Sequence, residues 1–105
     1  MRYSVYRNND VRFWGTSLEF MRDRNIAPRM SDYYRYKSSE IRTKDEERVT
    51  GTLDRIWYEL KNGGWEPYVG DVILLGDKNS SDAEYWIVQP IGFMILHDFE
   101  KEDQE

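Results

Sequence analysis

Three short apolar runs fill the last third of this 105-residue chain, and turn residues separate them. The segment WEPYVGDVILLGD becomes strand-like after Gly70, EYWIVQP covers Glu84–Pro90, and GFMILHDF covers Gly92–Phe99. Short runs of aliphatic and aromatic residues between Gly, Pro and Asp are typical of β-strands. Pro90 and Gly92 allow the chain to bend between the last two strands. These spacings constrain the fold most, because they predict a series of short antiparallel strands.

The N-terminus also has a β-pattern. Arg2–Tyr6 alternates and contains strand-forming residues, while RNND at Arg7–Asp10 is a turn signal. Val11–Trp14 is therefore predicted to pair back across this turn as a hairpin.

The following segment, TSLEFMRDRNIAP, predicts a short helix. Thr16 and Glu19 have the spacing of a capping box, which satisfies free N–H groups at a helix start. Leu18 and Met21 share one helical face, and Pro28 ends the run.

The segment Val49–Gly64 fits two structures. Val49, Leu53, Ile56, Trp57 and Leu60 form a helical stripe, to which Gly63 would add a C-terminal cap. However, the Thr and Gly residues at its start are poor helix formers, and Asn62–Gly64 is a hairpin turn signal. We favour a strand, bent or bulged near Asp54–Arg55, that pairs with the next segment across KNGG.

The predicted fold class is α+β and β-dominated. We expect a small antiparallel barrel or curled sheet of about five or six strands, with one short helix and a long loop. A chain of 105 residues suffices for a single domain over residues 1–105, and the 15% aromatic content is too high for a disordered chain.

Composition excludes several kinds of site. The chain has no cysteine, so disulfides, thiolate metal sites and cysteine nucleophiles are excluded, and a reducing compartment is favoured. No apolar run approaches the roughly 20 residues that cross a bilayer. The N-terminus lacks the apolar core of a signal peptide. We therefore expect a soluble intracellular protein without a membrane partner.

Charge is unevenly distributed along the chain. Residues 1–42 hold nine basic and five acidic side chains, whereas residues 43–105 hold six basic and fifteen acidic ones. One part could bind nucleic acid, or copies could meet head to tail. The alternative is that both halves interleave in one fold and their charges mix on its surface.

No catalytic constellation is visible, and we predict no enzyme activity, metal or cofactor. His97, the single histidine, is followed by Asp98 and Glu100. Adjacent residues of a strand point to opposite faces, so His97 and Asp98 would not act together. We expect His97 at a strand end near the surface. Asp71 and Asp77 flank an apolar strand, where acidic residues are expected to face solvent.

Residues 29–47 contain few aliphatics and are predicted to form a long loop or arm that is mobile until it meets a partner. Three tyrosines lie among cations here, a mixture that suits protein interfaces and nucleic-acid stacking, or covers a core edge. The net charge of −5 argues against strong DNA binding. The candidate partner-binding residues are Arg29, Tyr33, Tyr34, Arg35, Tyr36 and Lys37.

The last third resembles the C-terminal strand pattern of small phage head-closure (stopper) and minor capsid proteins. The matching residues are Gly70, Asp71, Ile73, Tyr85, Ile87 and His97. YVGDVI is also similar to an element of phage YopX-like proteins. The first resemblance implies a ring-forming, non-catalytic subunit between a portal-side adaptor and the tail, in the host cytoplasm or in the virion.

The leading expectation is thus a non-enzymatic phage structural or assembly protein of the head–tail connector type, which works through protein contacts. The main alternative is a small phage regulator or anti-defence protein that binds a host protein. Its carboxylates could imitate nucleic-acid phosphates, at Asp71, Asp77, Asp82 and Glu84. The third is a nucleic-acid-binding module that uses the Tyr and Arg residues of the predicted arm.

Overall fold

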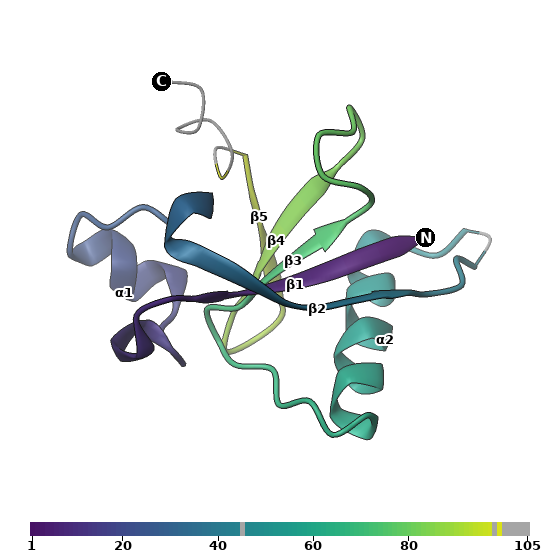
Figure 1. The fold of residues 1–105 in the computed structure, drawn as a ribbon, viewed down its shortest axis with the longest axis horizontal. Coiled ribbons are helices and arrows are strands. Elements are labelled where there is room, and N and C mark those ends of the chain that lie inside the picture. The colour runs from purple at the N-terminus through teal and green to yellow at the C-terminus, as the bar shows by residue number, and fades with distance from the viewer. Residues whose placement is uncertain (45, 98, 100–105) are drawn as a thin grey trace.

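The computed structural model describes residues 1–44, 46–97 and 99, and these form one five-stranded antiparallel sheet with helices on both faces (Figure 1). The strand order is β2-β1-β3-β4-β5. The elements are β1 (Arg2–Asn8), α1 (Leu18–Asp23), β2 (Tyr33–Glu40), α2 (Val49–Asn62), β3 (Val72–Leu75), β4 (Glu84–Val88) and β5 (Phe93–Leu96), with short 3-10 helices at Val11–Phe13 and Met30–Asp32.

The β-dominated fold class is confirmed, and of the two predicted forms the sheet is the curled, unclosed one. The strands predicted at Arg2–Tyr6, after Gly70, within Glu84–Pro90 and within Gly92–Phe99 are present, as is the helix after Thr16. In the described part of the chain, β2 and β5 each have a neighbour on one side and form the two edges.

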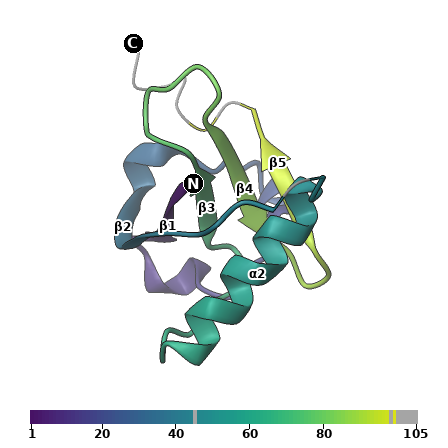
Figure 2. The same cartoon turned by 90° about the vertical axis from the view of Figure 1, so that its right-hand side faces the viewer.

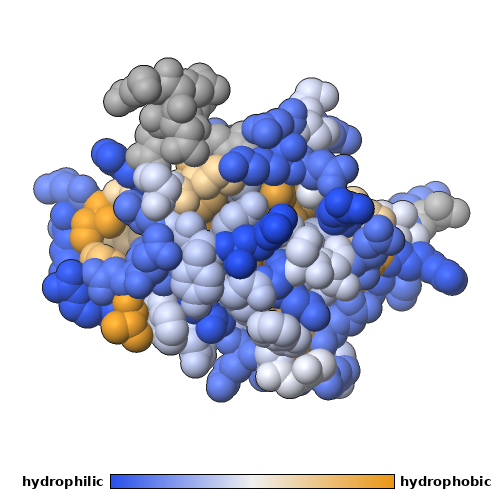
Figure 3. Space-filling model, in the orientation of Figure 1, coloured by the Kyte–Doolittle hydropathy of each residue, from blue (hydrophilic) through white to orange (hydrophobic). Residues whose placement is uncertain are grey.

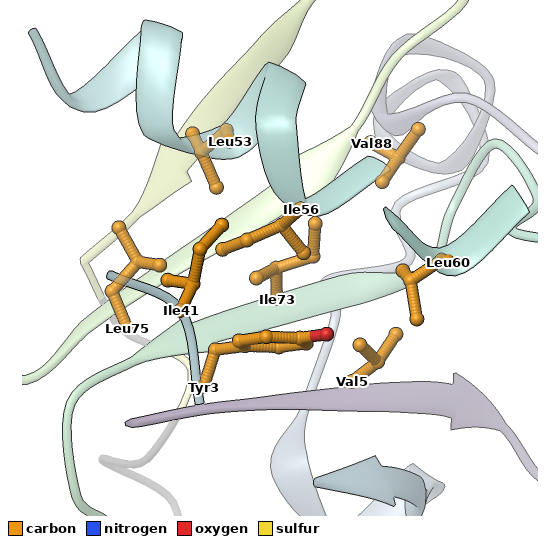
Figure 4. Packing of buried hydrophobic residues seen from close by; sticks show 9 residues of the cluster. All are labelled: Tyr3, Val5, Ile41, Leu53, Ile56, Leu60, Ile73, Leu75 and Val88. Carbon is orange, nitrogen blue, oxygen red and sulfur yellow. The ribbon is translucent and has the colours of Figure 1, made fainter. Parts of the chain in front are cut away.

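Alternation along the strands builds a core on each face. The face under α2 holds Tyr3, Val5, Ile41, Leu53, Ile56, Leu60, Ile73, Leu75 and Val88 (Figure 4). The face under α1 holds Tyr6, Leu18, Met30, Tyr33, Val72, Leu74, Tyr85, Ile87 and Phe99. Within β4, Val88 is buried, Trp86 packs against the same core, and Ile87 faces the other side under a helix.

The strand predicted for Val49–Leu60 is wrong, because this segment is the helix α2 (Figure 2). Leu53, Ile56 and Leu60 lie on one helical face and are at most 1% exposed. Burial of this stripe outweighs the poor helix propensity of the first turn. Gly63 then ends the helix, with its N–H donating to the Glu59 carbonyl. Consequently β3 pairs with β1 and β4, and not with the segment before KNGG.

The loop predicted over residues 29–47 is also wrong at its centre, since Tyr33–Glu40 form β2 at the sheet edge. The strand pairs with β1 from Asn8↔Tyr33 to Arg2↔Glu40. Buried Tyr33 at its start and buried Ile41 just after its end anchor it. Main-chain pairing thus orders a segment with few aliphatic residues.

Val11–Trp14 does not pair back as a strand, which corrects the predicted hairpin. Val11–Phe13 form a 3-10 helix. The Asp10 carboxylate caps its start by accepting a hydrogen bond from the Arg12 N–H. The Trp14 indole donates to the Asn8 carbonyl at 2.7 Å, which folds this turn back over the end of β1.

The two differently charged halves of the sequence interleave in the sheet. β1, from the basic half, pairs with β3 of the acidic half, and Leu18 of α1 packs in the same core as Ile87 of β4. His97 follows β5 and is exposed, as predicted. Asp98, Glu100 and the acidic tail lie outside the described residues.

Candidate functional site

A buried ion pair lies at the end of the sheet, on the face that carries α2. Arg7 of β1 and Asp71, which precedes β3, form a two-point contact, with Arg7 Nε 3.1 Å from Oδ1 and Nη2 2.9 Å from Oδ2. Arg7 Nη2 also donates to the Glu66 carbonyl at 2.7 Å. Side-chain exposure is 12% for Arg7 and 2% for Asp71. Asp71 is therefore not the solvent-facing strand end that the sequence suggested.

The turn before β3 explains why this carboxylate is held inside. The Tyr68 N–H donates to Asp71 Oδ2 at 2.9 Å, and the Asp71 N–H donates to the Tyr68 carbonyl at 3.0 Å. Gly70, at φ +96°, passes so close to the α1 side of the molecule that a Cβ would lie 2.6 Å from the Thr16 carbonyl oxygen. Gly70 is thus required by its conformation and by close packing.

Aromatic rings stack around the Arg7 guanidinium. Its Cζ lies 4.2 Å from the ring centroids of both Tyr36 and Tyr68, and 5.2 Å from that of Trp14. Cations near ring faces at these distances are attracted by the ring quadrupole. We call Arg7, Asp71 and the five aromatic residues around them the Arg7 cluster, which comprises Arg7, Trp14, Tyr34, Tyr36, Trp65, Tyr68 and Asp71.

The outer rings extend this stack to the surface. Trp14 stacks on Tyr68 with centroids 5.8 Å apart, and Trp65 stacks on Tyr36 at 5.7 Å. Tyr34 lies 6.4 Å from Tyr36. Trp14, Tyr34 and Trp65 are 37%, 40% and 38% exposed, so the cluster has a buried ionic base and an accessible aromatic rim.

A β-bulge in β2 places Tyr36 and Lys37 in this arrangement. Lys37 is paired with Val5 and Arg35 with Tyr6, which leaves Tyr36 as the extra residue. A bulge of this kind changes the direction of a side chain relative to the regular alternation. Tyr36 reaches the ion pair, while Lys37 Nζ lies 4.8 Å from the Trp65 centroid.

The surroundings raise the pKa values of Arg7 and Tyr36. Burial works to lower the pKa of Arg7, but its hydrogen bond to Asp71 and the charge of that carboxylate raise the pKa overall. Burial, followed by the nearby Asp71 charge, raises the pKa of Tyr36, whose hydroxyl donates to Asp71 Oδ2 at 3.1 Å. The cluster can offer fixed aromatic faces, with Arg7 charged and Tyr36 neutral near pH 7.

The structure brings only part of the predicted site together. Tyr34, Tyr36 and Lys37 lie at the Arg7 cluster. Tyr33 lies in the opposite core, where its ring is 5.1 Å from Phe99 and burial raises its pKa to about 12. Arg35 pairs with Tyr6 and so lies on the α1 face, and Arg29 precedes the 3-10 helix at Met30–Asp32.

Sequence reasoning missed Arg7, Trp14, Trp65 and Tyr68, and misjudged Asp71. These residues come from two segments, 7–14 and 65–71, which are far apart in the sequence, so no local spacing connects them. The one available signal was the Gly70-Asp71 pair, which predicted a turn but not the ion pair with Arg7.

A second ionic group lies at the start of α2. Glu47 accepts from Arg55 Nε at 2.7 Å and from the Thr52 hydroxyl at 2.8 Å, and Arg55 Nη2 also donates to the Arg42 carbonyl at 2.7 Å. The hydrogen bond from Arg55 is the main cause that lowers the pKa of Glu47 to about 2. These contacts fasten the chain before α2 to the helix and have a structural role.

Residues 1–44, 46–97 and 99 contain no group of three His, Cys, Asp or Glu side chains placed to hold a metal ion. The helices among them are too short or too polar to cross a membrane. No family model, curated protein or solved structure gives a significant match to the chain.

Proposed function

We propose that this protein is a non-enzymatic protein-binding subunit, and that the rim of the Arg7 cluster is its docking surface. The observation that supports this most is three partly exposed aromatic rings on a buried ionic base. Tyr, Trp and Arg are the residues that most often dominate binding energy at protein interfaces. The face of the molecule in Figure 3 is mostly polar, and its hydrophobic patches, in orange, are small and separate.

Rigidity of the base favours binding. Tyr36 is held by Asp71 and stacked between Arg7 and Trp65, so little side-chain freedom is left to lose on association. Pre-organised side chains lower the entropic cost of forming an interface. Trp14 is similarly held by its hydrogen bond to the Asn8 carbonyl.

A protein partner is favoured over nucleic acid. The predicted array of Tyr and Arg does not form one surface, because Arg35 lies on the α1 face and Tyr33 is buried. The Arg7 charge is matched by Asp71, and the chain carries a net charge of −5. Phosphate neutralisation, which dominates nucleic-acid affinity, therefore has little support at this surface.

Within this class, our proposal for the biological role is a head–tail connector subunit that contacts neighbouring phage proteins or forms rings. Its support is the resemblance of the C-terminal strands alone. The alternative, a regulator that imitates nucleic acid, has less support, because Asp71, one of its candidate carboxylates, is buried and paired with Arg7. Asp77 and Asp82 are exposed in the loop between β3 and β4, with half-buried Glu84 at its end. A gene position among portal and tail genes would favour the connector, and an early operon the regulator.

Co-purification with the products of neighbouring genes tests the docking surface. We expect capture of a partner by the native chain and its loss in the double variant Tyr34→Ala/Lys37→Glu, which removes an exposed ring and reverses a charge at the rim. The matched control is Tyr58→Ala/Lys61→Glu, the same two changes on exposed residues of α2. Equal capture by both double variants would refute this assignment of the surface.

A further inference from the structure

Among the described residues, no strand covers the outer edge of β5, which is apolar. β5 consists of Phe93, Met94, Ile95 and Leu96, and no described strand pairs with its outer side. Natural edge strands usually carry a charge, a proline or a bulge that discourages pairing with another chain. β5 has none of these, and its pairing with β4 is regular along its whole length. Met94 is 42% exposed on this strand.

The main-chain groups of Phe93 and Ile95 point away from the sheet. The Val88 N–H donates to the Asp71 carbonyl, and the Val88 carbonyl accepts from the Gly70 N–H. Neither main-chain group of Val88 is therefore available to Phe93, which lies opposite Val88 on β5. Val88 and Phe93 are therefore a non-hydrogen-bonded pair. Because the two kinds of pair alternate in an antiparallel ladder, Ile95 is oriented like Phe93.

This pattern is complementary to itself. If a second β5 approaches antiparallel about a two-fold axis through Met94, Phe93 of each copy faces Ile95 of the other. Both residues have outward N–H and C=O groups, so each pair exchanges main-chain hydrogen bonds. Met94 meets Met94 of the second copy, and the two sheets continue with α2 on the same face. The symmetry is isologous, the commonest form in homo-oligomers.

In the same register, an exposed apolar side chain of one copy would lie at a cavity of the other copy. Ile91, in the turn before β5, is 95% exposed. It would lie opposite His97 of the second copy, which lines a cavity of about 380 Å³ between β5 and the segment after α1. Ile26, Pro28, Leu96 and Phe99 also line it. Gly92 of the incoming strand would face Leu96 and, without a side chain, would leave the cavity open to Ile91.

We propose that two copies of this chain associate through their β5 edges into a continuous ten-stranded sheet, with Met94 on the two-fold axis and Ile91 at the cavity beside His97 of the other copy. This site is separate from the proposed docking surface, because β5 and β2 form opposite edges of the sheet. The dimer would carry two Arg7 clusters at its ends and could bind a repeated partner with increased avidity.

Sedimentation velocity over a dilution series tests the association. We expect the native chain to form a concentration-dependent dimer and the Met94→Lys variant to remain monomeric, because two lysines would meet on the axis. Tyr58→Lys places the same charge on the 69% exposed Tyr58 of α2 and should dimerise normally. A monomeric native chain, or dimerisation of Met94→Lys equal to that of the control, would overturn the proposal.

A cysteine crosslink tests the register independently of charge. The chain has no cysteine, so Met94→Cys introduces a single thiol. Opposed Cα atoms of a non-hydrogen-bonded pair lie about 4.5 Å apart, which a disulfide can bridge. Mild oxidation should therefore convert Met94→Cys to a covalent dimer and leave Ile91→Cys, several residues from the axis, largely uncrosslinked. Equal crosslinking of the two variants would contradict this register.

Discussion

At the scale of single residues, the ion pair between Arg7 and Asp71 organises the end of the sheet. Asp71 accepts hydrogen bonds from Arg7, the Tyr36 hydroxyl and the Tyr68 main chain, so one carboxylate joins β1, β2 and the turn before β3. A buried pair stabilises little relative to apolar residues of the same shape, but the loss of one partner leaves a buried charge. The geometry of the proposed docking surface therefore depends on Asp71.

The variant Asp71→Asn should strongly destabilise the protein. It keeps the side-chain shape but leaves the Arg7 cation without its counter-charge, and we expect a loss of about 3 kcal/mol in unfolding free energy. The exposed Asp77, 3.6 Å from Arg2, provides the control, because exposed pairs contribute little. Urea unfolding should show a change within about 0.5 kcal/mol for Asp77→Asn. Similar losses for the two variants would show that the Arg7 cluster is not held by this pair.

At the scale of elements, α2 and β2 differ most from the expectation. Both segments had ambiguous or weak local patterns, and distant partners determine their structure. Burial of Leu53, Ile56 and Leu60 against the sheet selects the helix. β2 is selected by its pairing with β1, between buried Tyr33 and buried Ile41. Local propensity could not show either partner, whereas the strands near the C-terminus were predictable from their apolar runs and turns.

The start of α2 should give a pH-dependent contribution to stability. The pKa of Glu47 is lowered from 4.5 to about 2 in the fold, so its ionised form is favoured there. Its contribution is fully present above the usual carboxyl pKa and is lost as the pH falls from about 5 to 2. The stability advantage of the native chain over Glu47→Gln should therefore be constant near pH 7 and vanish near pH 2. Thermal unfolding across this range measures it, and a difference that does not change with pH would exclude the contact.

At the scale of the whole molecule, one sheet separates two surfaces for which we propose different roles. The Arg7 cluster lies toward the β2 edge, on the face that carries α2, and the apolar edge that no described strand covers lies at β5. The β-dominated class and the position of His97 were predictable, because they follow from local patterns. The cluster was not, since β1, the turn after it, β2 and the segment before β3 come together only in the folded sheet. Tyr34, Tyr36 and Lys37 were recognisable by composition. The bulge that places both Tyr36 and Lys37 at the cluster was not.

We propose that the rim of the Arg7 cluster binds a protein partner and contributes little to folding. The most direct test of this proposal is the affinity of Tyr34→Ala/Lys37→Glu for the co-purifying partner, measured by titration calorimetry beside its unfolding free energy. We expect a loss of at least about 2 kcal/mol in binding, or roughly thirtyfold in Kd, because interface aromatics are frequent hot spots. The unfolding free energy should change by about 1 kcal/mol or less, as for most surface substitutions. An unchanged affinity with a loss of several kcal/mol in stability would contradict the claim and make these residues part of the fold alone.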